Sequence, residues 1–371
     1  MNERITFSGG DVKFDQPWTL PPIEIIDKSE QLEEQSHQQQ RYIISNFSYS
    51  PGLGNLMFQY ASLRAIAAKH NAKLIVPIAI NTISRFQECC KYIGDTIIDN
   101  LFMHSSNNER HSEQNNSFEL LIGYFQAFPY FHPHQEFLIR KQFQFLPDID
   151  SRARKLLERA KEEKIRDELT EQRSSKMIEN VKLNSQQIDA LSHQATAAVT
   201  QSIDDLFLSP SVSSPVSLLS ASSLSNTPPL IFVGVHVRHG MDVTMNNRNI
   251  KHGHTVANKQ YFQNAMQYFR EKYRNVLFIV ASDNLPWAKA NIFGTSRGEV
   301  FFLETNLREV DFATLVYCNH TIMSTGTFSW WIAYLNQGES IYYDGWPRPG
   351  SVLDKSVEKN DFFLKNWKPM S

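Results

Sequence analysis

The chain has 371 residues, a formal net charge of −2, and 25 Phe, 13 Tyr and 6 Trp residues. This length allows two domains of about 150 residues, each with its own core. The near balance of charges excludes a strong overall attraction to nucleic acid or to an anionic membrane, and the three cysteines (Cys89, Cys90 and Cys318) are too few for a disulfide framework.

Residues 1–40 are polar and end in a run rich in Glu, Gln and His, which predicts a flexible N-terminal segment. No apolar stretch approaches the ~20 residues that a membrane span needs, and no signal-peptide core is visible. The chain as written is therefore expected to be soluble.

Residues 41–150 are predicted to form a first α/β half. Arg41–Ile44 is apolar enough for a strand, and residues 73–76 predict a second one. Between them, a loop with Gly52 and Gly54 leads into a segment whose apolar residues recur at helical spacing. A strand, a glycine-containing loop, a helix and a strand are the start of an α/β unit.

Residues 151–230 are predicted to separate two halves of the chain. The segment from Ser151 to about Gln172 is charged and helical in pattern, whereas residues 173–229 are rich in Ser, Gln, Asn and Thr. This composition predicts a low-complexity linker or insertion.

Residues 231–371 alternate between candidate strands and helices. The strands are predicted at 231–238, 276–282, 299–303, 321–324 and 340–343, and the helices at 260–272, 286–292, 309–318 and 328–336. Such alternation predicts a parallel, doubly wound sheet, whose ligands bind at the carboxyl ends of the strands. His236, Arg238, Asp283 and the turn around Gly326 fall at such ends.

Arg238 follows a buried strand, and its planar guanidinium suits a phosphate group because it can pair with two oxygens at once. The alternative is a strand end whose polar residues merely meet solvent. The turn Thr325–Ser329 leads from a strand into a helix, so its hydroxyl and N–H groups can also bind phosphate. An ordinary helix cap explains that turn equally well.

Other polar residues allow two interpretations each. Asp283 and Asp311 suit contacts with a ribose or a guanine, or a turn and a helix cap. Gly54 and Asn55 suit a close approach to a ligand, or tight packing of a strand onto a helix. Asp148 and Asp150 have the spacing of a metal site, but carboxylates at the start of a helix favour capping.

Taken together, five ordered segments resemble the inverting α-1,2-fucosyltransferase family (glycosyltransferase family 11). They are the Gly-Asn loop with its helix, the segment Gly123–Phe131, the strand ending in His-Val-Arg-His, the segment from Ile279 to Trp287, and the segment from Cys318 to Leu335. The resemblance covers about residues 41–150 and 231–368.

The resemblance implies a GT-B-like fold, in which two Rossmann-like halves face a cleft and residues 41–150 form the acceptor side. It implies transfer of fucose from GDP-fucose to a galactose hydroxyl of a glycan, with inversion and no required metal or other cofactor. Relatives are usually anchored in the Golgi membrane, so a Golgi location is implied although no anchor is visible here. The donor-binding residues implied are Gly54, Asn55, Arg238, His239, Asp283, Asp311, Thr325, Thr327, Phe328 and Ser329.

The chain departs from the family pattern next to Arg238. His239 stands where the family has a second arginine and Met241 where it has an aspartate, which Asp242 replaces from the next position. The catalytic group expected is Arg238, with His236 and Asp242 as candidate bases beside an unidentified carboxylate of residues 41–150. The alternatives are a protein O-fucosyltransferase-like enzyme, and an inactive glycan- or nucleotide-binding protein.

Overall fold

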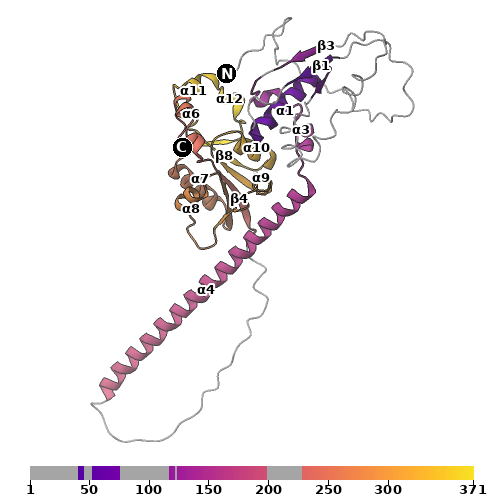
Figure 1. The fold of residues 1–371 in the computed structure, drawn as a ribbon. Coiled ribbons are helices and arrows are strands. Elements are labelled where there is room, and N and C mark those ends of the chain that lie inside the picture. Colours follow the sequence, from indigo (N-terminus) through magenta and orange to yellow (C-terminus); the bar gives the residue numbers. More distant parts are fainter. Residues whose placement is uncertain (1–40, 46–51, 76–116, 122, 199–227) are drawn as a thin grey trace, which may run out of the picture.

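The computed structural model describes residues 41–45, 52–75, 117–121, 123–198 and 228–371, which form two parallel β-sheets with helices around them (Figure 1). Residues 1–40, Cys89 and Cys90, and residues 199–227 lie outside the described residues. None of the described helices is both long enough and apolar enough to cross a membrane.

The first sheet has the order β2-β1-β3 and only parallel pairs. Its strands are β1 (Arg41–Ile44), β2 (Ala72–Ile75) and β3 (Ser117–Leu120), and helix α1 (Leu53–Lys69) connects β1 to β2. The predicted strand–helix–strand unit is therefore confirmed. The 3₁₀ helix η1 (Phe128–Tyr130) and helix α3 (Glu136–Gln142) follow.

The second sheet has the order β6-β5-β4-β7-β8-β9, again with every pair parallel. The strands are β4 (Ile231–Val237), β5 (Val276–Ser282), β6 (Val300–Phe302), β7 (His320–Met323), β8 (Ser340–Tyr343) and β9 (Lys368–Met370). Counted from β4, the order is 3-2-1-4-5-6, that of a doubly wound Rossmann-like domain. The winding direction changes between β4 and β7, and polar residues follow both of these strands.

Helices cover both faces of this sheet because its strands are apolar on both sides. In β5, Phe278 and Val280 pack with helix α7 (Lys259–Lys272) and helix α8 (Leu285–Asn291), whereas Leu277 and Ile279 belong to the core with α9 (Arg308–Val316) and α10 (Thr327–Asn336). This alternation follows the two-residue period of a strand. The remaining helices are short: α5 (Met241–Thr244), α6 (Asn247–His252), α11 (Val352–Ser356) and α12 (Lys359–Phe362).

The predicted elements of the second half are confirmed, with ends that differ by at most two residues. The prediction missed β9 because Lys-Pro-Met carries no strand pattern and proline cannot complete a ladder. It also missed the short helices, whose four to six residues are too few for a helical period.

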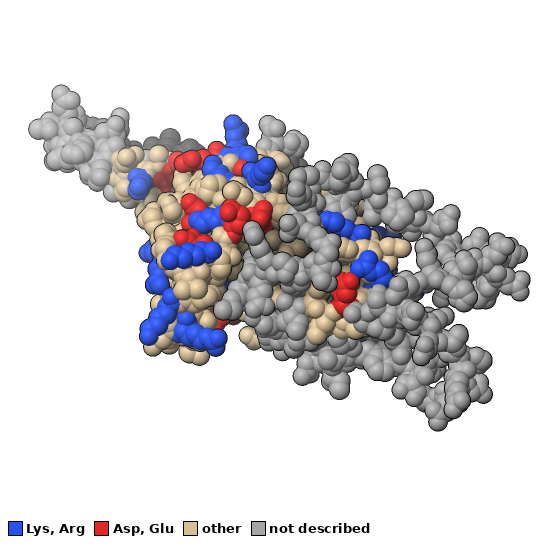
Figure 2. All heavy atoms as spheres, turned by 90° about the horizontal axis from the view of Figure 1, so that it is seen from above, with Lys and Arg blue, Asp and Glu red and all other residues tan. Residues whose placement is uncertain are grey.

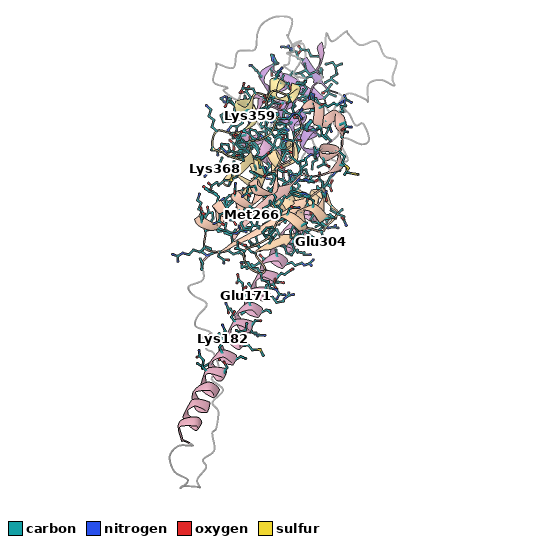
Figure 3. The ribbon with its side chains drawn as sticks, turned by 90° about the vertical axis from the view of Figure 1, so that its left-hand side faces the viewer. Glu171, Lys182, Met266, Glu304, Lys359 and Lys368 are labelled. Atoms are coloured by element: carbon teal, nitrogen blue, oxygen red, sulfur yellow. The ribbon has the colours of Figure 1, made fainter. Side chains whose placement is uncertain are left out.

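Helix α4 (Pro147–Ala198) is longer than predicted. Its 52 residues include positions 173–198, which were expected to belong to a low-complexity linker, so this part of the expectation is wrong. Polar composition misled the prediction, because Glu, Lys, Gln and Ala are also good helix formers. Glu171 and Lys182 lie on the part of the helix that extends away from the sheets, whereas Met266 lies in the body (Figures 1 and 3).

The N-terminal turns of α4 pack on α9 of the second half. Ile149, Ala153 and Leu157 are buried there, and the hydroxyl of Tyr317 donates to the Asp150 carboxylate. The start of the charged helix is therefore part of the core around the second sheet.

Helices α1 and α10 join the two halves at close range. Phe58 of α1 packs against Trp330 of α10, with ring centroids 4.4 Å apart. One turn earlier, a Cβ placed on Gly54 would lie 2.6 Å from the carbonyl carbon of Thr327. Only a residue without a side chain allows this approach, so Gly54 serves close packing, but of one helix against the start of another and not of a strand onto a helix as expected.

We expect Gly54→Ala to lower the free energy of unfolding by about 1–3 kcal/mol, because the new methyl group would overlap backbone atoms that cannot rotate away. This overlap outweighs the gain of about 1 kcal/mol that alanine brings to a helix interior. Urea unfolding measures the change. Gly52→Ala is the matched control, since a Cβ there meets nothing closer than 3.4 Å; equal stability of both variants would contradict the prediction.

Candidate functional site

The candidate site lies where β4 and β7 end, side by side, at the point where the winding of the sheet reverses. In doubly wound sheets this is the place where ligands bind. The chain leaves β4 through Arg238, His239 and Gly240, and it leaves β7 through the turn that begins α10. Both segments carry polar side chains.

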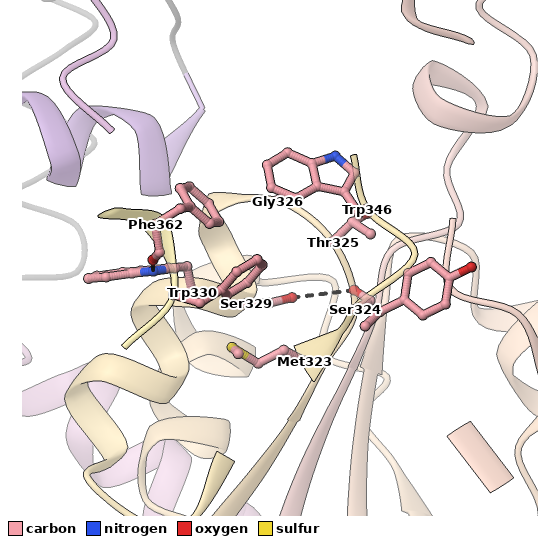
Figure 4. Close-up of a pocket in the computed structure, with 10 residues that line it drawn as sticks. Met323, Ser324, Thr325, Gly326, Ser329, Trp330, Trp346 and Phe362 are labelled. Carbon is pink, nitrogen blue, oxygen red and sulfur yellow. Dashed lines mark hydrogen bonds between the residues drawn. The ribbon is translucent and has the colours of Figure 1, made fainter. Parts of the chain in front are cut away.

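A buried hydrogen-bonded group connects the two strands beneath these segments. The Nδ1 atom of His236 lies 2.5 Å from Oγ of Ser329 and 3.2 Å from Oγ of Ser324. The two serine oxygens lie 3.3 Å apart, and Figure 4 shows the hydrogen bond between them. His236 and Ser329 were predicted site residues, whereas Ser324 was placed only as the last residue of a strand. The three side chains fix the end of β4 relative to the start of α10.

His236 is neutral at physiological pH. Burial, reinforced by the charge of Arg238, lowers the pKa of its imidazole from 6.5 to about 3. Its ring also packs near that of Phe328, with the centroids 4.9 Å apart. A base works best with a pKa near the working pH, so this environment suits a positioning role better than proton transfer.

Arg238 is held through both its backbone and its side chain. Its backbone N–H donates to Oγ of Ser324 at 3.0 Å, and its guanidinium pairs with Asp242 on α5. The Arg238 side chain also runs past Gly326, whose absent Cβ would lie 3.6 Å from Arg238 Cδ. Arg238 therefore stands between a partly exposed carboxylate and the start of α10.

The turn after Arg238 is anchored to β5. The backbone N–H of His239 donates to Oδ1 of Asp283 at 2.6 Å, and Asn284 Nδ2 donates to the carbonyl of His239. The imidazole of His239 stacks on Trp287, with the rings 4.0 Å apart and 12° from parallel. Asp283, predicted as a nucleoside contact, thus engages the turn with one oxygen.

The start of α10 is tied to the first half of the chain. Asn55 Oδ1 accepts hydrogen bonds from Thr327 Oγ1 at 2.7 Å and from Gln126 Nε2 at 2.8 Å. Gln126 lies in the segment 123–131 but was not singled out as a site residue. The N-cap residue of α10 is Gly326, so no side chain among the described residues caps this helix, and N–H groups of its first turn remain available to an anion.

Thr325 and Phe328, two further predicted residues, lie around this turn, whereas the predicted residue Asp311 lies elsewhere. Thr325 is buried directly before Gly326, and Phe328 packs between His236 and Phe312 of α9. Asp311 instead accepts a hydrogen bond from the hydroxyl of Thr305 at 2.6 Å, and burial raises the pKa of this carboxyl. Among the described residues, Asp311 forms no hydrogen bond or ion pair with Arg238.

The residues that sequence reasoning missed are Ser324, Gln126 and Trp287. Ser324 had a usable signal, since a polar residue at the end of an apolar strand of a parallel sheet lies at the binding edge. Gln126 and Trp287 are defined by contacts that span 71 and about 50 residues of chain, which local patterns do not reveal.

The Asp-Ile-Asp sequence is the start of a helix, as the capping interpretation predicts. Asp148 pairs with Arg152, and hydrogen bonds from Arg154 and Tyr317 lower the pKa of Asp150. Within the described ranges, no group of three or more His, Cys, Asp or Glu residues is arranged to hold a metal ion. On the face shown in Figure 2, acidic and basic side chains lie close together.

The arrangement can hold an anion. One guanidinium, the N–H groups at the start of a helix and several hydroxyl groups meet at the switch point of a parallel sheet. The fold is therefore that of a Rossmann-like α/β protein, and the groups at this edge are of the kind that could hold an anion.

Comparison with known proteins agrees with this class. Residues 216–371 match the model of glycosyl transferase family 11. Galactoside alpha-(1,2)-fucosyltransferase 2 of Sus scrofa is 38% identical over 147 residues, which are 39% of this chain and 42% of that protein. Galactoside alpha-(1,2)-fucosyltransferase 1 of the same species is 40% identical over 142 residues, 38% of each chain.

The corresponding type 1 protein of Bos taurus is 39% identical over 142 residues, 38% of this chain and 39% of its own. The chain thus spans about two fifths of the length of the curated relatives it matches. Over this part of its length the chain is similar to the galactoside α-1,2-fucosyltransferases, and the match to the glycosyl transferase family 11 model is confined to residues 216–371.

We expect His236→Asn to reduce the loss of stability in acid. The neutral imidazole contributes its full stability above pH 6.5 and loses it as the pH falls from 6.5 toward about 3, because the unfolded chain binds the proton more tightly. Between about pH 7.5 and pH 5 this amounts to about 2 kcal/mol. Urea unfolding at both pH values measures it; parallel pH dependence in wild type and variant would refute the burial argument.

Proposed function

We propose that this protein transfers L-fucose from GDP-fucose to a galactose hydroxyl of a glycan, forming an α-1,2 linkage with inversion and without a metal. The observation that carries the proposal is Arg238, placed at the switch point beside the open start of α10. This part of the chain lies within the match to glycosyl transferase family 11.

In this reaction the bond between the anomeric carbon of fucose and the β-phosphate oxygen breaks, and its electron pair leaves with GDP. The galactose oxygen attacks the opposite face of the anomeric carbon and gives its proton to a base. Negative charge grows on the diphosphate as the bond breaks. Arg238 and the N–H groups of α10 are fixed donors that would stabilise this charge, usually the largest electrostatic contribution to such catalysis.

Asp242 is favoured over His236 as the base from this half of the chain. A buried imidazole with a pKa of about 3 is a weak base near neutral pH. The Asp242 side chain is 50% exposed and therefore accessible to an acceptor. Its pairing with Arg238 supports a role next to the phosphate that we propose for this arginine.

We assign acceptor binding to residues 41–150, which makes the molecule GT-B-like, with two α/β halves across the site. The hydrogen bond from Thr327 to Asn55 supports this, since it places the start of α1 at the donor edge. A Golgi location remains an expectation from the family resemblance.

The second candidate function is binding of a nucleotide sugar without transfer. It is supported by His239, whose ring stacks on Trp287 and whose Nδ1 has no partner among the described residues. An imidazole cannot pair with two phosphate oxygens at once, as the planar guanidinium of an arginine does.

The two functions differ in one assay. We expect purified protein to release GDP from GDP-fucose when galactose-terminated acceptors are added, and EDTA to leave the rate unchanged. Product linkage is read by mass spectrometry and NMR. Binding of GDP-fucose with no release for any acceptor would favour the second function, and loss of release in EDTA would refute the metal-independent mechanism.

We expect Arg238→Ala to reduce transfer at least about 100-fold, because one fixed donor to a developing charge is worth about 3 kcal/mol. The fold should persist, since Arg238 is partly exposed and its backbone N–H is retained. Circular dichroism checks the fold. Arg152→Ala, on the exposed surface of α4, is the matched control; similar activity of the two variants would exclude Arg238 from the phosphate site.

A further inference from the structure

A small hollow lies beside the Gly326 turn. Its walls include Thr325 and Gly326 of the turn, Trp330 of α10, Trp346 of the loop after β8, and Phe362 of α12 (Figure 4). The rings of Trp346 and Phe362 lie 5.1 Å apart. The hollow has room for roughly one water-sized group, so it accepts a single functional group rather than a whole sugar.

Two hydrogen-bonding groups of this wall have no partner among the described residues. They are Oγ1 of Thr325 and Nε1 of Trp346, in side chains that are 5% and 6% exposed. The neighbouring Trp330 shows the usual arrangement, because its Nε1 donates to the carbonyl of Phe362 at 2.5 Å. A buried polar group without a partner costs stability, so two of them around one hollow point to a ligand atom.

We propose that Trp346 and Thr325 form a subsite for one hydroxyl group of the sugar carried by the nucleotide. The indole N–H would donate to the hydroxyl oxygen, and the threonine hydroxyl would complete its hydrogen bonding. Both groups are uncharged and the surrounding walls are aromatic, which suits a neutral hydroxyl and disfavours a desolvated phosphate oxygen. The phosphate side of the turn already has Arg238. This inference rests on the proposed function and adds a specificity-determining residue, Trp346, to it.

Isothermal titration of the full chain with GDP-fucose and with GDP tests the subsite. Trp346→Phe removes the N–H while keeping an aromatic ring, and Thr325→Val removes only the hydroxyl. We expect each variant to bind GDP-fucose about 3- to 10-fold more weakly, the value of one hydrogen bond, and to bind GDP as wild type does. Without ligand, Thr325→Val should unfold at the wild-type temperature or above, because it removes a buried hydroxyl that has no partner among the described residues.

Trp331→Phe is the matched control, because its Nε1 is also buried without a partner but does not line the hollow. The subsite is refuted if Trp346→Phe and Thr325→Val bind GDP-fucose as tightly as this control. Equal weakening for GDP and GDP-fucose would indicate a phosphate oxygen, and a lower unfolding temperature of ligand-free Thr325→Val would indicate a resident water; both overturn the proposal. Failure of wild type to bind GDP-fucose would instead overturn the proposed function, and the subsite with it.

Discussion

The close contact between α1 and the start of α10 is the constraint on which the site depends. Gly54 allows the two backbones to approach, and the side chain of Asn55 accepts a hydrogen bond from the hydroxyl of Thr327. The N-cap of α10 is Gly326, which has no side chain, so the first turn of this helix stays open beside α1. One packing requirement in the first half thus fixes the position of an uncapped helix end in the second half.

The buried group of His236, Ser324 and Ser329 gives this edge its rigidity. It joins β4 to β7 across the switch point with neutral hydrogen bonds. A charged imidazole here would be buried next to the positive charge of Arg238. Burial and this charge therefore both lower the pKa of His236. The buried imidazole of His236 therefore adds no positive charge next to Arg238.

The second sheet was largely predictable because its strands are continuous apolar runs and its helices have a clear period. Strand β5 and strand β8 agree with the prediction at both ends. The true length of α4 was not predictable from polarity alone, since an exposed helix and a linker share a composition. Within the site, Arg238 and the Gly326 turn were predictable because they follow the ends of strands. Gln126, Trp287 and Trp346 depend on contacts between distant segments, which local patterns do not show. Asp311 was grouped with Arg238, but a carboxylate at the start of a helix can instead accept a hydrogen bond from a nearby hydroxyl.

The hydrogen bond between Thr327 and Asn55 joins residues 272 positions apart. Closing so long a loop is slow relative to local helix formation, and during synthesis Asn55 emerges well before its partner exists. Until both segments are present, the start of α10 lacks its partner on α1. The second half carries Arg238 and the uncapped start of α10, and the first half adds Asn55 beside them only once the two halves have packed together.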